Sequence, residues 1–133
     1  MCGCGKAARH NYTHINIDSY TTKDIEFYTE YESYTTDDTQ FKCFFTYNGN
    51  KDFVHLSDIA NCFLIKKTNN EWYKLEVTGE VVDFFCSKDC LKGIQYTSTI
   101  RIGAYYDLPL ETGLYRLVWD NYVSDAFKIE NAK

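Results

Sequence analysis

The chain has 133 residues, of which 44% are hydrophobic and 25% are charged. This length suits one domain, and the balance of apolar and charged residues excludes a wholly disordered chain, a coiled coil and a low-complexity sequence. Aromatic residues reach 17%, with 12 Tyr and 9 Phe, whereas Pro and Met occur once each. Because Tyr and Phe suit the half-buried surface of a sheet, the composition predicts an all-β domain.

The net charge is −5, from 14 basic and 19 acidic residues. Nucleic-acid-binding proteins draw most of their affinity from clustered basic residues, so no nucleic-acid partner is expected. The sequence contains no run of about 18 apolar residues, so no transmembrane segment is expected either. Residues 1–16 are polar and contain glycine, unlike a hydrophobic signal segment.

Alternation of apolar and polar residues predicts the first strands. Residues 25–34 (IEFYTEYESY) and residues 40–47 (QFKCFFTY) alternate on either side of a polar break, which favours an antiparallel hairpin. In the first of these strands, Tyr31 is expected to face inward, and Tyr28 and Tyr34 are expected to face outward.

The middle of the chain predicts a second hairpin. Residues 53–60 are ambiguous between a strand and an irregular connection. Residues 61–67 and 71–77 are β-like and are joined by the short Asn-rich segment 68–70, which favours a hairpin turn. Residues 81–85 form a short apolar run.

The C-terminal third holds the most regular strand, residues 94–102 (IQYTSTIRI), which alternates throughout. Residues 108–113 form a connection, and residues 114–119 and 124–130 form the last hairpin. These seven or eight strands, at intervals of about ten residues, are typical of sandwiches and small barrels.

We therefore predict that residues 16–133 form one antiparallel β-sandwich and that residues 1–15 are a flexible N-terminal tail. The alternative architecture is a closed barrel that carries a small apolar ligand, which eight strands and many inward aromatic side chains would permit.

Three motifs occur in order along residues 53–130. Trp72 and the Tyr that follows it come after a Lys-bearing strand, an alternating polar strand comes next, and the run LETGLYRL carries Gly113 and Tyr115. Together these motifs resemble the bacterial immunoglobulin-like modules of Gram-positive surface proteins and lipoproteins. The resemblance implies an immunoglobulin-like sandwich of seven to eight strands, without catalytic residues or a cofactor, that serves in adhesion or as a spacer. Trp72, Gly113 and Tyr115 are its expected structural residues.

Tyr115 also has a physical interpretation of its own. It stands near the start of a strand after a Gly-containing corner, as in the tyrosine corner of immunoglobulin-like sandwiches, where the Tyr hydroxyl bonds to backbone upstream. The strand 114–119 contains no Cys, so the usual disulfide between the two sheets cannot form there.

Six cysteines occur in the chain, and six cysteines allow 15 pairings, so the connectivity is left open. Disulfides are expected if the chain is exported. The spacing of Cys86 and Cys90 is too wide for a thioredoxin-type motif, so redox catalysis is not expected. The candidates for disulfides are Cys43, Cys62, Cys86 and Cys90.

The start of the chain holds four residues of zinc-binding type, namely Cys2, Cys4, His10 and His14. Only one residue separates the two cysteines, where structural zinc sites have two to four, so no metal site is predicted. Cys2 is instead the candidate for lipid attachment. A lipid there would place the chain at the cell surface or outside the cell, with a cytoplasmic chain as the alternative.

The segment His55-Leu56-Ser57-Asp58 contains the residue types of a catalytic triad. Adjacent residues of a strand point to opposite faces, so this segment alone does not predict a triad. No glycine-rich phosphate loop occurs either. We therefore predict that the protein is not an enzyme and needs no cofactor.

Four tyrosines are the candidates for ligand binding: Tyr28 and Tyr34 on the outward face of a strand, and Tyr105 and Tyr106 in a loop. Exposed aromatic rings give contact area at a low cost in entropy, although such rings also pack across strands as pairs. The sequence thus predicts a surface-associated module that binds an unidentified protein or glycan, or acts as a spacer. The alternative is a carbohydrate-binding or enzyme-inhibitor domain that uses the same aromatic surface.

Overall fold

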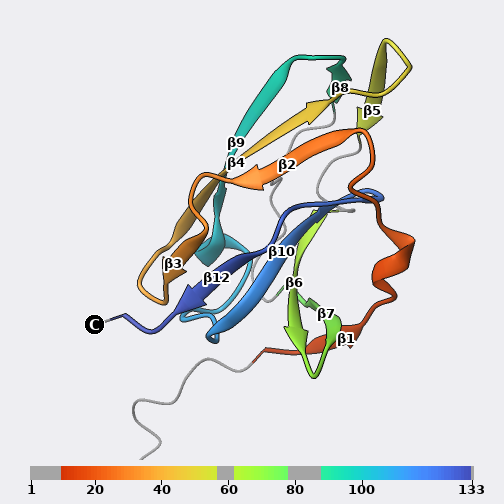
Figure 1. The fold of residues 1–133 in the computed structure, drawn as a ribbon. Helices are drawn as coiled ribbons and strands as arrows, with labels where there is room; N and C mark the ends of the chain where they lie inside the picture. Colours follow the sequence, from red (N-terminus) through yellow and green to blue (C-terminus); the bar gives the residue numbers. More distant parts are fainter. Residues whose placement is uncertain (1–9, 57–61, 78–87, 133) are drawn as a thin grey trace, which may run out of the picture.

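The computed structural model describes residues 10–56, 62–77 and 88–132 (Figure 1). Strands dominate this part of the chain, whose helical elements are the short 3-10 turns η1 (Ile17–Ser19) and η3 (Ile102–Ala104). The predicted all-β class is therefore confirmed. The short apolar run at residues 81–85 lies outside the described residues.

The larger sheet has the strand order β1-β7-β6-β10-β12-β3, and β11 pairs with β10 beyond the turn that joins them. All pairs are antiparallel except β12 with β3, which run parallel. The bounds are β1 (Tyr12–His14), β3 (Ser33–Thr35), β6 (Cys62–Thr68), β7 (Glu71–Leu75), β10 (Gly113–Trp119), β11 (Tyr122–Val123) and β12 (Phe127–Glu130).

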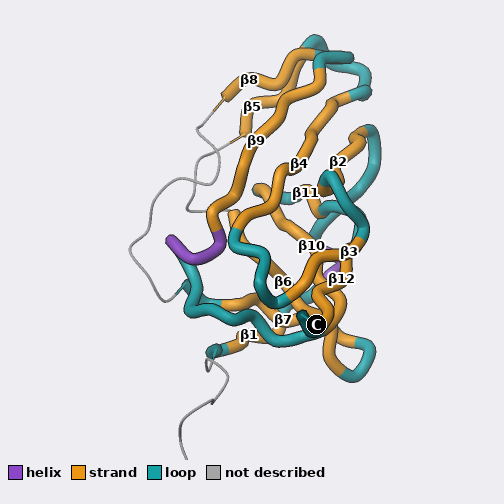
Figure 2. Tube along the Cα trace, turned by 90° about the vertical axis from the view of Figure 1, so that its left-hand side faces the viewer, coloured by secondary structure: helices purple, strands orange, loops and turns teal. Residues whose placement is uncertain are grey.

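The smaller sheet has the order β2-β4-β9, and a separate two-stranded ribbon pairs β5 with β8. The ribbon lies at one end of β4 and β9 (Figure 2), where the Gly93 amide donates a hydrogen bond of 2.8 Å to the Tyr47 carbonyl. The described strands thus form open sheets rather than a closed barrel. The bounds are β2 (Ile25–Thr29), β4 (Gln40–Tyr47), β5 (Phe53–Leu56), β8 (Lys88–Leu91) and β9 (Gln95–Arg101).

The two sheets pack face to face through aromatic side chains. Phe45 on β4 meets Trp119 on β10 with 5.4 Å between ring centroids, and Phe41 meets Phe127 on β12 at 5.1 Å. These rings are buried in one apolar cluster that both sheets share. The alternation predicted for residues 40–47 therefore places the expected side chains in the core.

The outer face of the larger sheet is also apolar and is covered by the N-terminal segment. Trp72 on β7 lies in this second cluster, together with Val118 of β10, and residues 15–20 pack against it. The Ile15 amide donates to the Trp72 carbonyl at 3.1 Å, and β1 pairs with β7. The predicted flexible tail of residues 1–15 is thus wrong for β1, which is an edge strand of the sheet.

A tight corner precedes β10. The Tyr115 hydroxyl donates a hydrogen bond of 2.6 Å to the Glu111 carbonyl, four residues upstream, as expected from its position after a Gly-containing corner. Gly113 has a φ of +152°, and a Cβ there would lie 2.8 Å from Cε of Lys66. The Lys66 ammonium lies 3.5 Å from the Glu111 carboxylate. The corner is therefore held by the Tyr115 hydroxyl and by a φ at Gly113 that residues with a side chain rarely adopt.

We predict that Tyr115→Phe lowers the free energy of unfolding by about 1–2 kcal/mol, because a partly buried hydrogen bond is lost while the ring remains. Urea denaturation measures the change. The matched control is Tyr73→Phe, since the Tyr73 hydroxyl makes no hydrogen bond within the described part of the structure. Equal midpoints for the two variants would contradict a stabilising corner.

We also predict that the protein loses stability above pH 10. Burial raises the pKa values of Tyr106 and Tyr115 above the ordinary value of 10.0, so the unfolded chain loses these protons before the folded chain does. The free energy of unfolding is then unaffected below pH 10 and falls above it, by up to about 1.4 kcal/mol per pH unit for each tyrosine. Denaturation at a series of pH values tests this, and a flat profile between pH 10 and 12 would refute it.

Candidate binding site at the β5–β8 ribbon

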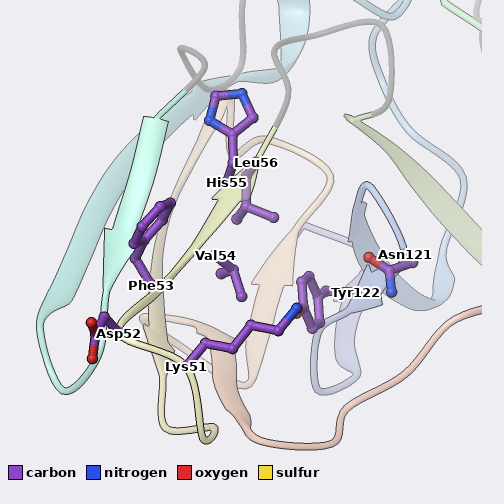
Figure 3. A pocket seen from close by; sticks show the side chains of 8 residues that line it. All are labelled: Lys51, Asp52, Phe53, Val54, His55, Leu56, Asn121 and Tyr122. Carbon is purple, nitrogen blue, oxygen red and sulfur yellow. The ribbon is translucent and has the colours of Figure 1, made fainter.

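A groove of about 460 Å³ lies between β5 and the turn that joins β10 to β11 (Figure 3). The Lys51 side chain points toward the ring of Tyr122, and Phe53 lies on the far side of β5 from it. We call this the ribbon groove, and it is lined by Lys51, Asp52, Phe53, Val54, His55, Leu56, Asn121 and Tyr122.

Local contacts fix the chain that enters the groove. The Tyr47 hydroxyl accepts a hydrogen bond of 3.1 Å from the Lys51 amide, and the Lys92 amide donates to the Asp52 carbonyl at 2.9 Å. A Cβ at Gly49 would overlap the Tyr47 ring, so the turn closes over this ring only because Gly49 has no side chain. The turn therefore sets where β5 begins.

The outer face of the ribbon presents apolar side chains to solvent. Phe53 stands opposite Leu91 in the ladder, and the two side chains are 45% and 52% exposed. The alternate positions Leu56 and Cys90 are buried in the shared core. Since the ribbon is anchored on its inner face, its outer face holds the exposed pair at a fixed position.

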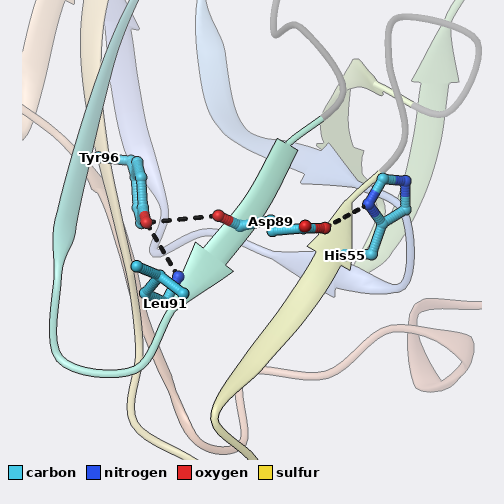
Figure 4. A network of polar contacts seen from close by, with 4 residues as sticks. All are labelled: His55, Asp89, Leu91 and Tyr96. Carbon is cyan, nitrogen blue, oxygen red and sulfur yellow. Dashed lines mark hydrogen bonds and ion pairs between the residues drawn. The ribbon is translucent and has the colours of Figure 1, made fainter.

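A polar network lies on the same outer face (Figure 4). His55 Nδ1 lies 2.7 Å from Asp89 Oδ1, and the Tyr96 hydroxyl donates to the Asp89 carbonyl at 3.3 Å. The same hydroxyl accepts from the Leu91 amide at 2.9 Å, which ties β9 to the ribbon.

Three of the four tyrosines predicted to bind a ligand are buried. Tyr34, Tyr105 and Tyr106 are each less than 9% exposed, so the prediction of an exposed surface there is wrong. The chain leaves the smaller sheet after Thr29 and enters the larger one at β3, which turns Tyr34 inward. Tyr106 follows η3, and its hydroxyl accepts a hydrogen bond from the Leu64 amide at 3.1 Å.

Tyr28, the fourth, does lie on the outward face of β2. Its ring packs against Phe44 with 5.3 Å between centroids, and its hydroxyl accepts a hydrogen bond of 3.1 Å from Gln95. Tyr28 is thus half-buried in a cross-strand pair. Tyr31, which the alternation predicts to face the core, instead projects its ring into solvent. Strand alternation did not indicate either Tyr31 or Phe53 as an exposed residue.

The candidate disulfide cysteines lie in the core. Cys43 and Cys62 are buried free thiols, so no disulfide joins them to each other. Burial raises the pKa of Cys43 to about 12 and the pKa of Cys62 well above the ordinary value of 9.0, which makes both poor nucleophiles. Cys90 is also buried, whereas its candidate partner Cys86 and the candidate lipid site Cys2 lie outside the described residues.

Among the described residues, no three His, Cys, Asp or Glu side chains gather as ligands for a metal ion. His10 contacts the Asp107 carbonyl at 2.7 Å and His14 contacts the Glu71 carboxylate at 3.0 Å, while the two cysteines of the zinc-type motif lie outside the described part. Nor does that part contain a helix of the length and apolarity needed to cross a membrane. No protein-family model matches the chain, and no match to a curated protein was found.

We predict that Cys43 and Cys62 resist alkylation in the native protein and react once the chain is unfolded, because burial shields both thiols. Alkylation with and without denaturant, followed by peptide mass spectrometry, gives the labelled fraction at each cysteine. A disulfide-linked peptide that joins the two, or rapid labelling of native Cys43, would contradict the buried free thiols.

Proposed function

We propose that the chain is an immunoglobulin-like sandwich that acts as a non-catalytic binding module. The strand order supports this. If β2, β4 and β9 are taken as strands A, B and E, and β6, β10 and β12 as C, F and G, the two sheets contain A-B-E and C-F-G, the arrangement of immunoglobulin-like folds. The strand β7, beside β6, then takes the place of C′.

The corner before β10 adds a second, independent argument. Tyr115 stands at the start of the proposed strand F and bonds to the backbone four residues upstream, which is the geometry of a tyrosine corner. Leu117 occupies the position two residues later, where antibody domains have a cysteine. In this chain the Phe45 and Trp119 rings join the sheets instead.

The position of the ribbon groove is the observation that carries the proposed function. Residues 51–56 belong to the connection between the proposed strands B and C, and Asn121 and Tyr122 belong to the connection between F and G. These two connections meet at the end of the sandwich that bears the binding loops in antibody variable domains. We therefore place the binding site of this module in the ribbon groove.

The chemistry of the site suits a protein partner. Phe53 and its ladder partner Leu91 supply exposed apolar area on the ribbon beside the groove, and Lys51 and Asp52 supply charge in the groove itself. Protein interfaces combine apolar or aromatic anchors with a polar rim in this way. A spacer would need no such groove, so we favour binding over a spacer role.

The surface location is part of the same proposal and rests on the resemblance of residues 53–130 to modules of Gram-positive surface proteins. A lipid on Cys2 would anchor the module there. A cytoplasmic location is the alternative, and buried free thiols such as Cys43 are compatible with either.

We predict that Phe53→Asp removes partner binding, because a carboxylate replaces an exposed apolar side chain of the ribbon that lines the groove. The immobilised chain is used to capture proteins from a cell-surface extract, and the bound proteins are quantified by mass spectrometry. One or a few proteins should be recovered at least about tenfold less on Phe53→Asp than on the wild-type chain.

The matched control is Tyr31→Asp, which places the same charge on an exposed aromatic residue outside the ribbon groove. Melting temperatures close to that of the wild type show that both variants are folded. If every captured protein binds the two variants equally, the ribbon groove is not the site, and if nothing is captured, a spacer role replaces binding.

A further inference from the structure

We propose that a second groove, around Tyr31, binds a neutral oligosaccharide. This groove has a volume of about 470 Å³, within the range of small-molecule sites. Its lining includes Gln40, the first residue of β4. The ribbon groove begins at Lys51, shortly after Tyr47 ends the same strand, so the two grooves lie at opposite ends of β4. The lining residues are Glu30, Tyr31, Ser33, Tyr34, Asp38, Gln40, Lys42 and Thr99.

Tyr31 offers a ring on a fixed backbone. Its side chain is 60% exposed, yet its amide donates a hydrogen bond of 3.1 Å to the Tyr34 hydroxyl and its carbonyl accepts one of 2.7 Å from the Thr29 hydroxyl. The Tyr31 ring also meets the buried Tyr34 ring edge to face, with 5.9 Å between centroids. Because the ring is already held, stacking a ligand on it costs little conformational entropy.

The groups around the ring suit hydroxyl-rich ligands. Within the described part of the chain, the side chains of Glu30, Gln40 and Lys42 make no hydrogen bond or ion pair with other residues, so they are available to a ligand. A carboxylate accepts, an amide both donates and accepts, and an ammonium donates, which together match the vicinal hydroxyls of a sugar. The apolar C–H face of the sugar ring then stacks on Tyr31.

The charge of the groove selects among glycans. Glu30 and Asp38 contribute two negative charges and Lys42 contributes one positive charge, so the lining is net negative. The Glu30 amide donates to the Lys42 carbonyl at 2.8 Å, which holds the backbone of the two charged residues together. Sulfated, sialylated and uronic-acid glycans would be repelled, so a neutral glycan is the expected ligand.

This proposal does not depend on the proposed protein-binding role, because the two grooves share no lining residue. The probes are neutral β-glucan, chitin, mannan and galactan oligosaccharides, with sulfated and sialylated glycans as anionic comparisons. Binding is screened on immobilised glycans and then measured by titration of the isotope-labelled chain, with amide chemical shifts as the readout.

We expect one neutral class to bind and to shift the amide signals of Tyr31, Gln40 and Thr99. Tyr31→Ala should weaken binding at least about tenfold, since the stacking ring is lost, and Tyr31→Trp should retain it. Phe53→Asp, in the other groove, should leave the glycan affinity unchanged. Thermal melts of the three variants show that they are folded.

Three results would overturn the proposal. These are no binding by any neutral oligosaccharide, equal binding by wild type and Tyr31→Ala, and binding of the anionic glycans alone. Loss of glycan binding on Phe53→Asp but not on Tyr31→Ala would assign the sugar to the ribbon groove and equally reject the site at Tyr31.

Discussion

The aromatic contact between the two sheets is the interaction on which the rest of the structure depends. Phe45 and Trp119 meet at 5.4 Å across the core, and no disulfide joins the buried thiols Cys43 and Cys62. Each large ring buries 150–250 Å², and truncation of such a ring to Ala costs about 3–5 kcal/mol. Because β4 carries Phe45, this contact fixes the strand whose two ends position the two grooves.

The larger sheet is buried on both faces, which limits where a partner can bind. Its inner face packs on the smaller sheet, and its outer face, which includes Trp72 and Val118, lies under residues 15–20. The Arg116 guanidinium lies 5.4 Å from the centre of the Trp72 ring and covers part of the outer face around Trp72. Among the described residues, the exposed large aromatic side chains are Phe53 on the ribbon and Tyr31 in the β2–β3 connection.

Much of the fold follows from local patterns in the sequence. Residues 40–47 alternate with a period of two, and they form β4 with the expected inward face. The hairpin of β6 and β7 turns at Asn69 and Asn70, which take φ values of 53° and 67° that Asn tolerates better than most residues. Such features depend on neighbouring residues alone, so composition and spacing are enough to predict them.

The exposed residues of the candidate sites could not be found in the same way. The segment IEFYTEYESY alternates without interruption, yet β2 ends at Thr29 and β3 begins at Ser33 in the other sheet, so Tyr31 points outward and Tyr34 inward. The exposure of Phe53 is set by its pairing with β8, more than thirty residues away. Alternation predicts which side chains of one strand share a face. It does not predict where the chain passes from one sheet to the other, or which distant strand will pair with a given strand.

The length of β4 separates the two sites physically. Eight residues at about 3.3 Å each span roughly 26 Å, so a compact ligand at one end of the strand cannot also reach the other. Tyr31 and Phe53 both project from the surface, whereas the residues that align the ends of β4, Phe41 and Phe45, lie in the core. A substitution at either exposed ring therefore changes one groove and leaves intact both the aromatic contact between the sheets and the opposite groove.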